Sequence, residues 1–589
     1  MKFLSHTSRY IQGQDQQGKI TCRLCSDQKA SICETRPGSK AYSGYVHIPA
    51  NKTADIGGFD INAYFLYFQA RESPETAPLA IYLAGGPGES STYAVFDSEN
   101  GPCIVNVFGN ETTENEWSFN QHANVLYVDQ PVQAGFSYSD LINGTVNIED
   151  EAVMPQVFDS SNGLPAASRI SGYGTFPGQD AAKTTNTTVS SGRAMWHFDE
   201  HWLTSFPPYA TTSALEAGSK AISVWGNSYG GFWVPETGVQ LSRNLERLHE
   251  DHPLHGRQLR LEAIGTTNGC IDLATAMLGY PEFAINNTYD VQFISEDLYT
   301  ASIQNITGSG GCLDQLQYCR EIAQAGDPET TGANATINEL CQLALLSCEI
   351  VINVLNEVNN VSAFDVAVAE PDICPYYLPV EQYLNRVAVQ QQLGVPLNFS
   401  LLSYTVDKVF GFASSSPSLS SSTGDAARQA GVNNLAYLLD RGVRVALIFG
   451  DRDYRCPWTG GEPTAEAVMW SGQNAFLNAG YQKLQNLPPD SHGAVVRQAG
   501  QLSFTRVFDA GHSVSAYAPN TVFSIFSRTL AGLDVASGRL PAHDGYHTFG
   551  PANSYSWRNT MPSGWPITDS CMVAGKFLPV DPWVALVSS

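Results

Sequence analysis

The residues best suited to chemistry are a serine, an aspartate and a histidine that occur in this order along the chain. Ser228 lies in Gly226-Asn-Ser-Tyr-Gly230, directly after an apolar run, and Asp453 and His512 each follow a further apolar run. A serine hydroxyl becomes a good nucleophile when a neutral imidazole accepts its proton, while a carboxylate fixes the tautomer of that imidazole. The three residues therefore predict acyl transfer through a serine nucleophile.

The segments before these residues read as strands that end in polar or glycine-rich loops. The predicted strands are 42–48, 63–68, 79–83, 124–128, 221–225, 259–264, 444–449 and 504–508. Helical patterns alternate with them, and the longest spans 337–354. This alternation predicts a largely parallel α/β sheet, with function at the carboxyl ends of the strands. The order serine, aspartate, histidine is that of the α/β-hydrolase fold.

The chain divides by composition into a core and its insertions. We expect an N-terminal extension over 1–40 and a hydrolase core formed by 41–269 and 401–589. Residues 140–195 are rich in Ser, Gly and Thr and are predicted to form a surface insertion. Residues 270–400 hold six cysteines and several helical stretches, which predicts an inserted, disulfide-stapled helical cap.

Charge and hydropathy exclude several classes of partner. The chain has 57 acidic against 32 basic residues, a net charge of −25, whereas binding to a nucleic-acid backbone requires a basic surface. No apolar stretch approaches the roughly 20 residues that span a bilayer. We therefore expect no nucleic-acid partner and no membrane span.

Cysteines and glycosylation sequons point to an oxidising compartment. Twelve cysteines suit disulfide bonds, and nine Asn-x-Ser/Thr sequons suit N-linked glycans. The sequons begin at Asn51, Asn110, Asn143, Asn186, Asn286, Asn305, Asn334, Asn360 and Asn398. No secretory signal is visible in the first twenty residues. We expect an extracellular, secreted or vacuolar protein whose N-terminus is incomplete here.

Five segments together resemble the motifs of serine carboxypeptidases, a family of α/β hydrolases. They are Gly85-Gly-Pro-Gly88, Asp129-Gln-Pro-Val-Gln-Ala-Gly-Phe-Ser-Tyr138, Gly226-Asn-Ser-Tyr-Gly-Gly231, Gly450-Asp-Arg-Asp-Tyr-Arg-Cys456 and Ala510-Gly-His512. They occur in the family's order and cover the chain from about 42 to 519. The resemblance is to the fungal secreted type.

The resemblance implies a role for each matching residue. Ser228 would be the nucleophile, His512 the base and Asp453 the acid, with Asp451 structural. The reaction implied is hydrolysis of the C-terminal peptide bond of peptides through an acyl-enzyme, without a metal or other cofactor. An acyltransferase or esterase on the same triad is the alternative, and a non-catalytic binding protein of the same fold is the alternative from another class.

The resemblance also implies two binding sites, and the chain departs from the family in one of them. The oxyanion hole would be the backbone N–H groups of Gly86 and Tyr229. The substrate carboxylate would meet Gly85, Glu99 and Asn227, the last in place of a family glutamate.

Two substitutions in that carboxylate site suggest altered recognition. Ala84 stands where the family has Asn, and the amide of Asn227 can donate a hydrogen bond without first being protonated. We therefore expect a KM less restricted to acidic pH than a glutamate pair would give. The same losses also suit another acyl donor.

The resemblance further implies a disulfide pattern. The pairs would be Cys312–Cys348 and Cys319–Cys341, with Cys103–Cys374 a third, and Cys456 a free thiol. Five cysteines stay unassigned: Cys22, Cys25, Cys33, Cys270 and Cys571.

Two segments with metal-like spacing are read as structural. Cys22-x-x-Cys25 has no second pair at metal spacing, which favours disulfides, and His249-Glu-Asp-His252 departs from the His-Glu-x-x-His of metalloproteases. No metal site is expected.

Overall fold

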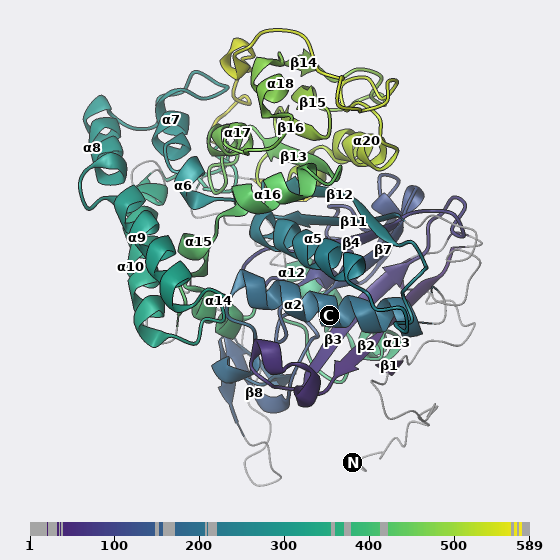
Figure 1. Ribbon diagram of the computed structural model, residues 1–589. Helices are drawn as coiled ribbons and strands as arrows, with labels where there is room; N and C mark the ends of the chain where they lie inside the picture. The colour runs from purple at the N-terminus through teal and green to yellow at the C-terminus, as the bar shows by residue number, and fades with distance from the viewer. Residues whose placement is uncertain are drawn as a thin grey trace.

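The computed structural model places a large twisted sheet at the centre of the protein (Figure 1). The residues that it describes are 20–21, 32–33, 36, 39–147, 152–156, 171–206, 209, 221–354, 360–369, 378–412, 422–566, 570–573 and 576–579. Among them, eleven strands form the sheet in the order β1-β2-β3-β7-β4-β11-β12-β13-β16-β15-β14. The six strands from β7 to β16 in that order run parallel, and the flanking strands pair antiparallel.

The strands coincide with the apolar runs of the sequence, because alternate side chains of each strand bury against opposite faces. Their bounds are β1 Ile20–Thr21, β2 Ala41–Ile48, β3 Ile61–Phe68, β4 Leu79–Leu83, β7 Asn124–Val128, β11 Ala221–Asn227, β12 Arg260–Thr267, β13 Arg444–Gly450, β14 Gln482–Lys483, β15 Ala494–Ala499 and β16 Leu502–Val507. All eight predicted strands are confirmed, and with them the α/β-hydrolase fold.

Helices cover both faces of the sheet. One face packs against α2 (Thr188–Ser205), α5 (Gly230–Glu246), α16 (Gly431–Leu439) and α17 (Trp458–Glu466). The other face packs against α1 (Ser91–Ala94), α12 (Leu378–Leu384), α13 (Val387–Leu393), α19 (Val514–Tyr517) and α20 (Pro519–Leu530). In β11, Val224 belongs to the first core and Trp225 to the second. The sheet is thus buried on both sides, as parallel sheets are.

Smaller elements complete the chain. Three strands form a separate small sheet, β8 Leu141–Asn147, β9 Val153–Pro155 and β10 Ser171–Pro177. Two further pairs are β5 Cys103–Val105 with β6 Thr112–Glu114, and β17 Ser570–Val573 with β18 Lys576–Pro579. Short 3-10 turns are η1 Ala50–Lys52, η2 Ala54–Ile56, η3 Phe119–Gln121, η4 Ala181–Lys183 and η5 Ser554–Ser556, and α18 spans Gln473–Asn478.

The segment 140–195 contains more structure than its composition suggested. Its first part holds the small sheet, but α2 begins at Thr188 and packs on α5 of the core. Thr187 caps this helix through a reciprocal side-chain and backbone pair with Ser190. The end of this segment is therefore part of a helix packed on α5, and its polar Thr-Thr-Val-Ser-Ser run is the start of that helix.

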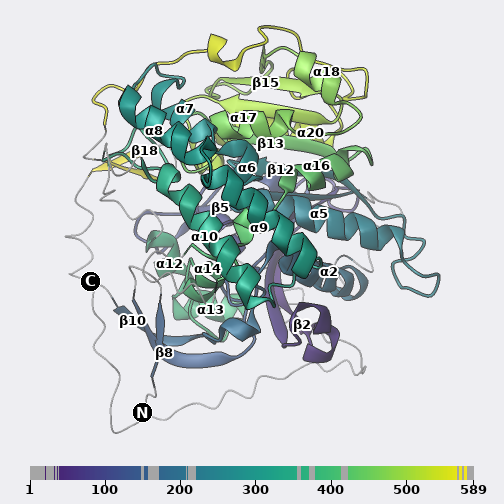
Figure 2. The ribbon, with the colours of Figure 1, turned by 60° about the vertical axis from the view of Figure 1, so that its left-hand side comes forward.

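The cap is a group of helices at one side of the sheet, at the left in Figure 1 and at the front in Figure 2. They are α6 Leu273–Ala276, α7 Gly279–Ile285, α8 Glu296–Thr307, α9 Cys312–Gly326, α10 Ala335–Ile352, α14 Tyr404–Phe410 and α15 Asp425–Arg428. Disulfides Cys312–Cys348 and Cys319–Cys341 join α9 to α10, which confirms the nested pairing. Only α10, among the described helices, has the length and apolarity to cross a membrane, and its buried side packs against α9.

Two other cysteine expectations are wrong. Cys103 pairs with Cys33 and not with Cys374, because the start of β5 lies beside the segment at 32–33. Cys456 is not a free thiol: it is bonded to Cys270, which the chain places opposite it at the neighbouring strand end. Cys22, Cys25 and Cys374 lie outside the described residues.

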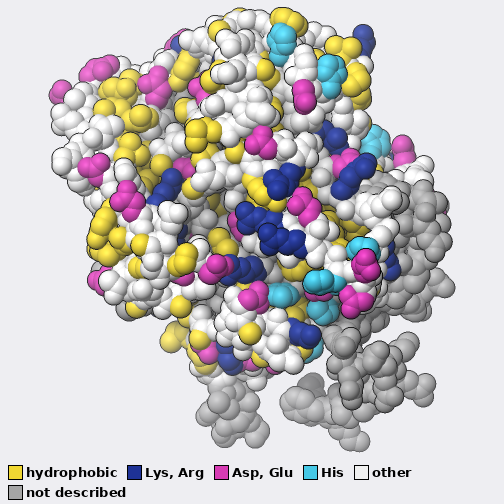
Figure 3. Space-filling view, in the orientation of Figure 1, with side chains coloured by type: hydrophobic (Ala, Val, Ile, Leu, Met, Phe, Trp, Pro, Cys, Tyr) yellow, Lys and Arg dark blue, Asp and Glu magenta, His cyan; other side chains and the backbone are white. Residues whose placement is uncertain are grey.

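Basic side chains gather on the face of this acidic protein that Figure 3 shows. In Figure 3 the dark blue side chains lie mostly across the middle of the view, over the region of α2, α5 and α16. Arg243 and Arg441 lie over the ring of Tyr437, 4.8 and 3.6 Å from its centre. Cation–π contacts of this kind fasten α5 to α16 at the surface.

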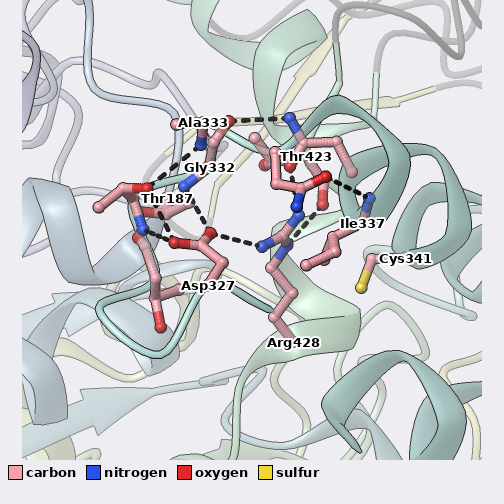
Figure 4. Close-up of polar contacts among 12 residues, drawn as sticks. Thr187, Asp327, Gly332, Ala333, Ile337, Cys341, Thr423 and Arg428 are labelled. Carbon is pink, nitrogen blue, oxygen red and sulfur yellow. Dashed lines mark hydrogen bonds and ion pairs between the residues drawn. The ribbon is translucent and has the colours of Figure 1, made fainter. Parts of the chain in front are cut away.

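A buried ion pair holds helices of the cap together (Figure 4). Arg428 of α15 pairs with Asp327 at 3.2 Å, donates to the carbonyl of Thr423 at 2.7 Å and bonds Asn338 of α10. Asp327 in turn accepts from the backbone N–H of Gly332 at 2.9 Å. Both charged side chains are at most 5% exposed, so each depends on the other.

Replacing Arg428 by Leu should therefore destabilise the protein strongly. The change leaves a buried carboxylate without its cation, which costs about 3–5 kcal/mol. Urea denaturation would measure the loss. Lys183→Gln, which removes an exposed pair with Asp140, should cost at most about 1 kcal/mol. Equal losses in the two variants would contradict the role assigned to the buried pair.

Candidate active site

The predicted nucleophile, Ser228, lies on a sharp turn between β11 and α5. Ser228 has φ 57°, in the left-handed region that residues with a Cβ rarely adopt. Its carbonyl accepts from the N–H groups of Gly231 at 2.8 Å and Cys270 at 3.0 Å. These bonds hold the strained conformation, as expected for the turn of an α/β hydrolase.

Glycines allow the neighbouring loops to approach this turn closely. A Cβ on Gly85 would lie 2.7 Å from the Cβ of Ser228 and from the nitrogen of Tyr229. A Cβ on Gly226 would lie 2.4 Å from the carbonyl oxygen of Leu83. The loop after β4 therefore lies directly against Ser228, and only glycine fits at these positions.

A buried aspartate holds that loop in place. Asp129, at the end of β7, accepts hydrogen bonds from the hydroxyls of Ser90 and Thr92 and the backbone N–H of Thr92 and Phe136, at 2.7–2.9 Å. Burial raises the pKa of this carboxyl, and the four donors oppose the shift. The Asp-Gln-Pro segment of the sequence thus acts as an anchor for the loop beside Ser228.

The aspartate and histidine of the predicted triad are brought together. His512 Nδ1 lies 2.9 Å from Asp453 Oδ2. An ionised carboxylate can only accept, so Nδ1 carries the proton, and Nε2 of a neutral ring has a free lone pair. Within the described residues Nε2 has no hydrogen-bond partner, and no bond joins it to the Oγ of Ser228. Such contacts are often long before substrate binds.

The loop after β12 supports the acid. The side-chain amide of Asn268 donates to Asp453 Oδ2, and its oxygen Oδ1 accepts from the backbone N–H of Gly450 at 3.0 Å. The N–H of Cys456 donates to the same carboxylate oxygen at 3.2 Å. The disulfide Cys270–Cys456 then joins the two loops covalently. Sequence reasoning missed both Asn268 and this disulfide, although Asn268-Gly-Cys270 follows a predicted strand.

Backbone donors are free where the oxyanion hole was predicted. Within the described residues, neither the N–H of Gly86 nor that of Tyr229 has an acceptor. The N–H of Gly85 has none either. The hydroxyl of Tyr229 donates to Asp425, and this bond helps to fix the position of the Tyr229 backbone. Free N–H groups beside a serine nucleophile are suited to a developing oxyanion.

Asn227 has partners inside the protein. Its amide nitrogen lies 3.1 Å from both the carbonyl and the hydroxyl oxygen of Thr267, and 3.2 Å from the carbonyl of His512. Two hydrogens are thus shared among three acceptors. The predicted contact with a substrate carboxylate stays a prediction, and the structure adds a second duty: Asn227 positions the backbone of His512.

Carboxyl groups gather beside His512. Glu99 is buried and accepts from the hydroxyl of Tyr82 at 2.8 Å, and burial raises its pKa. Glu89 directly follows the Gly85–Gly88 loop and is half-buried. Its burial, together with the charge of Glu99, raises the pKa of Glu89 to about 7, while His512 opposes the shift. Sequence reasoning missed Glu89, whose place next to that loop was the available signal.

Two other residues that the sequence analysis named, Asp451 and His252, have hydrogen-bond partners that suit a structural role. Asp451 accepts from the hydroxyl of Tyr289 at 2.8 Å, and burial raises its pKa to about 7. His252 bonds Glu200 of α2 at 2.8 Å. Among the described residues, no three His, Cys, Asp or Glu side chains are grouped to hold a metal ion.

The sheet order, the strained serine and the Asp–His pair define the protein as an α/β hydrolase with a serine nucleophile turn. A family model described as serine carboxypeptidase matches residues 32–532. The chain belongs to the serine carboxypeptidase family, and is a hydrolase of the serine-type carboxypeptidase class.

Curated relatives carry carboxypeptidase names. A carboxypeptidase S1 homolog A of Arthroderma otae is 37% identical over 547 residues, which cover 90% of this chain and 80% of the relative. A carboxypeptidase Y homolog of Arthroderma benhamiae is 35% identical, with 89% and 81% covered. The crystal structure of Kex1Δp, a prohormone-processing carboxypeptidase from Saccharomyces cerevisiae, shares the fold with a TM-score of 0.57 at 20% identity, covering 85% of this chain and 92% of that one.

Removing the support of the acid loop should slow the reaction. Asn268→Ala deletes a charge-assisted hydrogen bond to Asp453, worth about 1.5–3 kcal/mol, so kcat should fall by roughly ten- to hundredfold with little change in KM. Steady-state kinetics on a blocked dipeptide would measure both. The control is Asn434→Ala, which removes an amide in α16 that donates to Glu236 in α5. This change should leave kcat unchanged. A rise in KM alone would contradict this assignment.

Proposed function

We propose that the protein removes the C-terminal residue of peptides with Ser228 as nucleophile, His512 as general base and Asp453 as its orienting acid. The observation that carries the proposal is the hydrogen bond between Asp453 and His512 Nδ1. This bond leaves Nε2 as the free acceptor of the imidazole. The imidazole lies at the same edge of the sheet as Ser228. No metal or other cofactor takes part in this scheme.

Each proton has a place in the two steps. Ser228 Oγ attacks the scissile carbonyl while His512 Nε2 takes its proton. The C–N bond then breaks, and the same imidazole returns the proton to the leaving amine. Water, deprotonated by His512, hydrolyses the acyl-enzyme and frees Ser228. Asp453 stabilises the imidazolium that forms in each step.

The oxyanion of each tetrahedral intermediate would lie between the N–H groups of Gly86 and Tyr229. Their lack of internal acceptors supports this assignment. Each donor contributes about 3 kcal/mol to transition-state stabilisation in comparable sites.

The free carboxylate of the substrate would lie on the side of His512 where the leaving amine departs. Gly85 offers a free N–H there, and Glu99 lies near both His512 and Ser513. A protonated carboxyl can donate to a carboxylate, whereas an ionised one repels it. Glu89 adds a second carboxyl near Glu99, on this same side. Asn227 would act here through its hold on the His512 carbonyl.

The compartment and modifications follow from the cysteines and sequons. Four disulfides occur within the described residues, which suits an extracellular or vacuolar enzyme. Six of the nine sequon asparagines are exposed and open to N-linked glycans, namely Asn51, Asn110, Asn143, Asn305, Asn334 and Asn360.

Ser228 should carry the activity, and a free carboxylate should be required. A fluorophosphonate probe should label the wild type at Ser228, and Ser228→Ala should lower kcat by a factor on the order of 10⁴–10⁶. A blocked dipeptide should be hydrolysed and its C-terminal amide spared. Turnover of esters alone, with no amino acid released from peptides, would favour the esterase or acyltransferase alternative.

The KM for a blocked dipeptide should rise above about pH 7. Below that pH the raised pKa keeps Glu89 protonated and able to donate, while above it the ionised group repels the substrate carboxylate. KM should then increase up to about tenfold per pH unit, and Glu89→Gln should remove the rise.

A matched variant controls for general effects of buried acids. Glu381 of α12 has a pKa that burial raises to about 7, but it bonds the N–H of Leu401 instead of facing His512. Glu381→Gln should keep the wild-type pH profile of KM. A profile that rises steeply already above pH 5–6 in the wild type would count against Glu89 and for a more acidic pair.

A further inference from the structure

The segment 546–566 follows the part of the chain that matches the family, and it begins against the edge of the sheet. The N–H of Gly500 donates to the carbonyl of Tyr546 at 2.8 Å, and the N–H of Thr548 donates to that of Gln498 at 2.9 Å. In Figure 1 this yellow part of the chain runs along the top of the molecule, beside α18. The segment is therefore attached to the β15–β16 hairpin at its start.

A buried arginine holds the middle of the segment 546–566. Arg506 in β16 has no exposed surface, and its Nη2 donates to the carbonyls of Ser554 at 2.8 Å and Trp557 at 3.0 Å. Its guanidinium carbon lies 4.2 Å from the centre of the Trp458 ring, which also packs against the ring of Tyr555. A guanidinium loses its hydration on burial, so it needs acceptors inside the protein. The segment supplies two of them and is thus part of the folded body.

The far end of the segment reaches the loop that carries His512. Asn559 Nδ2 donates to Asp509 Oδ2 at 2.9 Å. Asp509 follows β16 and has φ 59°, in the left-handed region that residues with a Cβ rarely adopt. Arg452, the residue before Asp453, donates to the carbonyl of Asp509 at 3.0 Å. Asn559 therefore holds the side chain of the residue at which the histidine loop and the acid loop meet.

A second contact reaches the same two loops by another route. Trp565 Nε1 donates to the carbonyl of Val366 at 2.8 Å. The N–H of Val366 donates to the carbonyl of Arg452 at 3.0 Å, and the carbonyl of Phe364 accepts from the N–H of His512 at 2.7 Å. The short stretch around Val366 thus bridges the acid loop and the histidine loop through main-chain bonds. Trp565 holds this bridge from behind.

The two side chains that make these contacts are themselves held in place. The N–H of Asn559 donates to the carbonyl of Thr288 at 2.9 Å. The ring of Trp565 lies 6.0 Å from that of Phe293, edge to face. Both side chains are half-buried. Residues that position a catalytic group must be fixed by further contacts of this kind.

The bond between His512 Nδ1 and Asp453 Oδ2 depends on how the two loops lie relative to each other. The loops follow different strands, β13 and β16, and a hydrogen bond weakens steeply as its geometry worsens. A displacement of about 1 Å in a catalytic group can cost about a hundredfold in rate. Contacts that fix both loops from outside therefore bear directly on catalysis.

We propose that Asn559 and Trp565 are positioning residues of the triad and that the segment 546–566 braces the two loops that carry Asp453 and His512. The proposal rests on the proposed function, since it takes these two residues as the catalytic pair. Asn559 acts through Asp509, and Trp565 acts through Val366. Neither contact involves a group assigned to substrate binding, so their loss should lower kcat with little effect on KM.

The test measures Asn559→Ala and Trp565→Phe by two readouts. Each change removes one hydrogen bond, so kcat on a blocked dipeptide should fall by about three- to tenfold while KM stays within about twofold. The rate at which a fluorophosphonate probe labels Ser228 should fall by a similar factor, because that reaction also needs the His512 base but no peptide. Trp565→Phe keeps an aromatic ring against Phe293 and removes the N–H donor, so it tests the contact with the packing largely preserved.

Asn559→Asp sharpens the assignment. The change keeps the size of the side chain but replaces the donor to Asp509 by a carboxylate that repels it. The kcat of this variant should therefore be lower than that of Asn559→Ala. A wild-type kcat in Asn559→Asp would contradict the role of this bond.

A control within the same segment separates positioning from general stability. Asn553 is exposed, and its side chain accepts only from the N–H of Tyr555, at 2.7 Å. Asn553→Ala should leave kcat and the labelling rate unchanged. Urea denaturation of each variant would confirm that the assays compare folded proteins.

The outcomes distinguish this proposal from the function on which it rests. If the wild type is neither labelled by the probe nor able to cleave a blocked dipeptide, the proposed function fails. If the wild type is active but folded Asn559→Ala and Trp565→Phe are labelled at its rate, the positioning role is overturned. A rise in KM at constant kcat would overturn it as well.

Discussion

The close approach of three backbone segments at Ser228 is the constraint on which the active site depends. The loop after β4, the turn after β11 and the loop after β12 meet within van der Waals distance, which is possible because Gly85, Gly226 and Gly231 lack a Cβ. The left-handed backbone of Ser228 is held by its hydrogen bonds to that assembly. Ser228 is therefore positioned by main-chain contacts with two neighbouring loops.

Buried polar residues behind the site hold these loops in place. Asp129 holds the loop after β4, and Asn268 joins the loop after β12 to Asp453. The hydroxyl of Tyr229 reaches Asp425, which also caps α2 at Thr188. Each anchor is a buried polar group whose partners are other loops, so the carboxyl edge of the sheet is one connected network. The cap rests on this edge through α15, which begins at Asp425 and carries Arg428 of the cap's buried ion pair.

Much of the fold could be predicted because the signals were local. The eight strands are short apolar runs with clear ends, and their order with the serine, aspartate and histidine specified the hydrolase sheet. The start of α2 was missed because Thr and Ser dominate its first turn and read as loop, although a capping box was present. Cys270, Asn268 and Glu89 were not predicted as site residues, since their importance arises from strands that are adjacent in space but distant in sequence.

The bond between Cys270 and Cys456 gives the site a dependence on the compartment where the chain matures. It ties the loop that contacts the carbonyl of Ser228 to the loop that carries Asp453, so part of the catalytic geometry is established by oxidation and not by folding alone. A copy held in a reducing cytosol would lack this tie beneath its acid loop, whereas a copy in an oxidising compartment would acquire it. Formation of this disulfide during maturation and the positioning of the loop that carries Asp453 are thus linked.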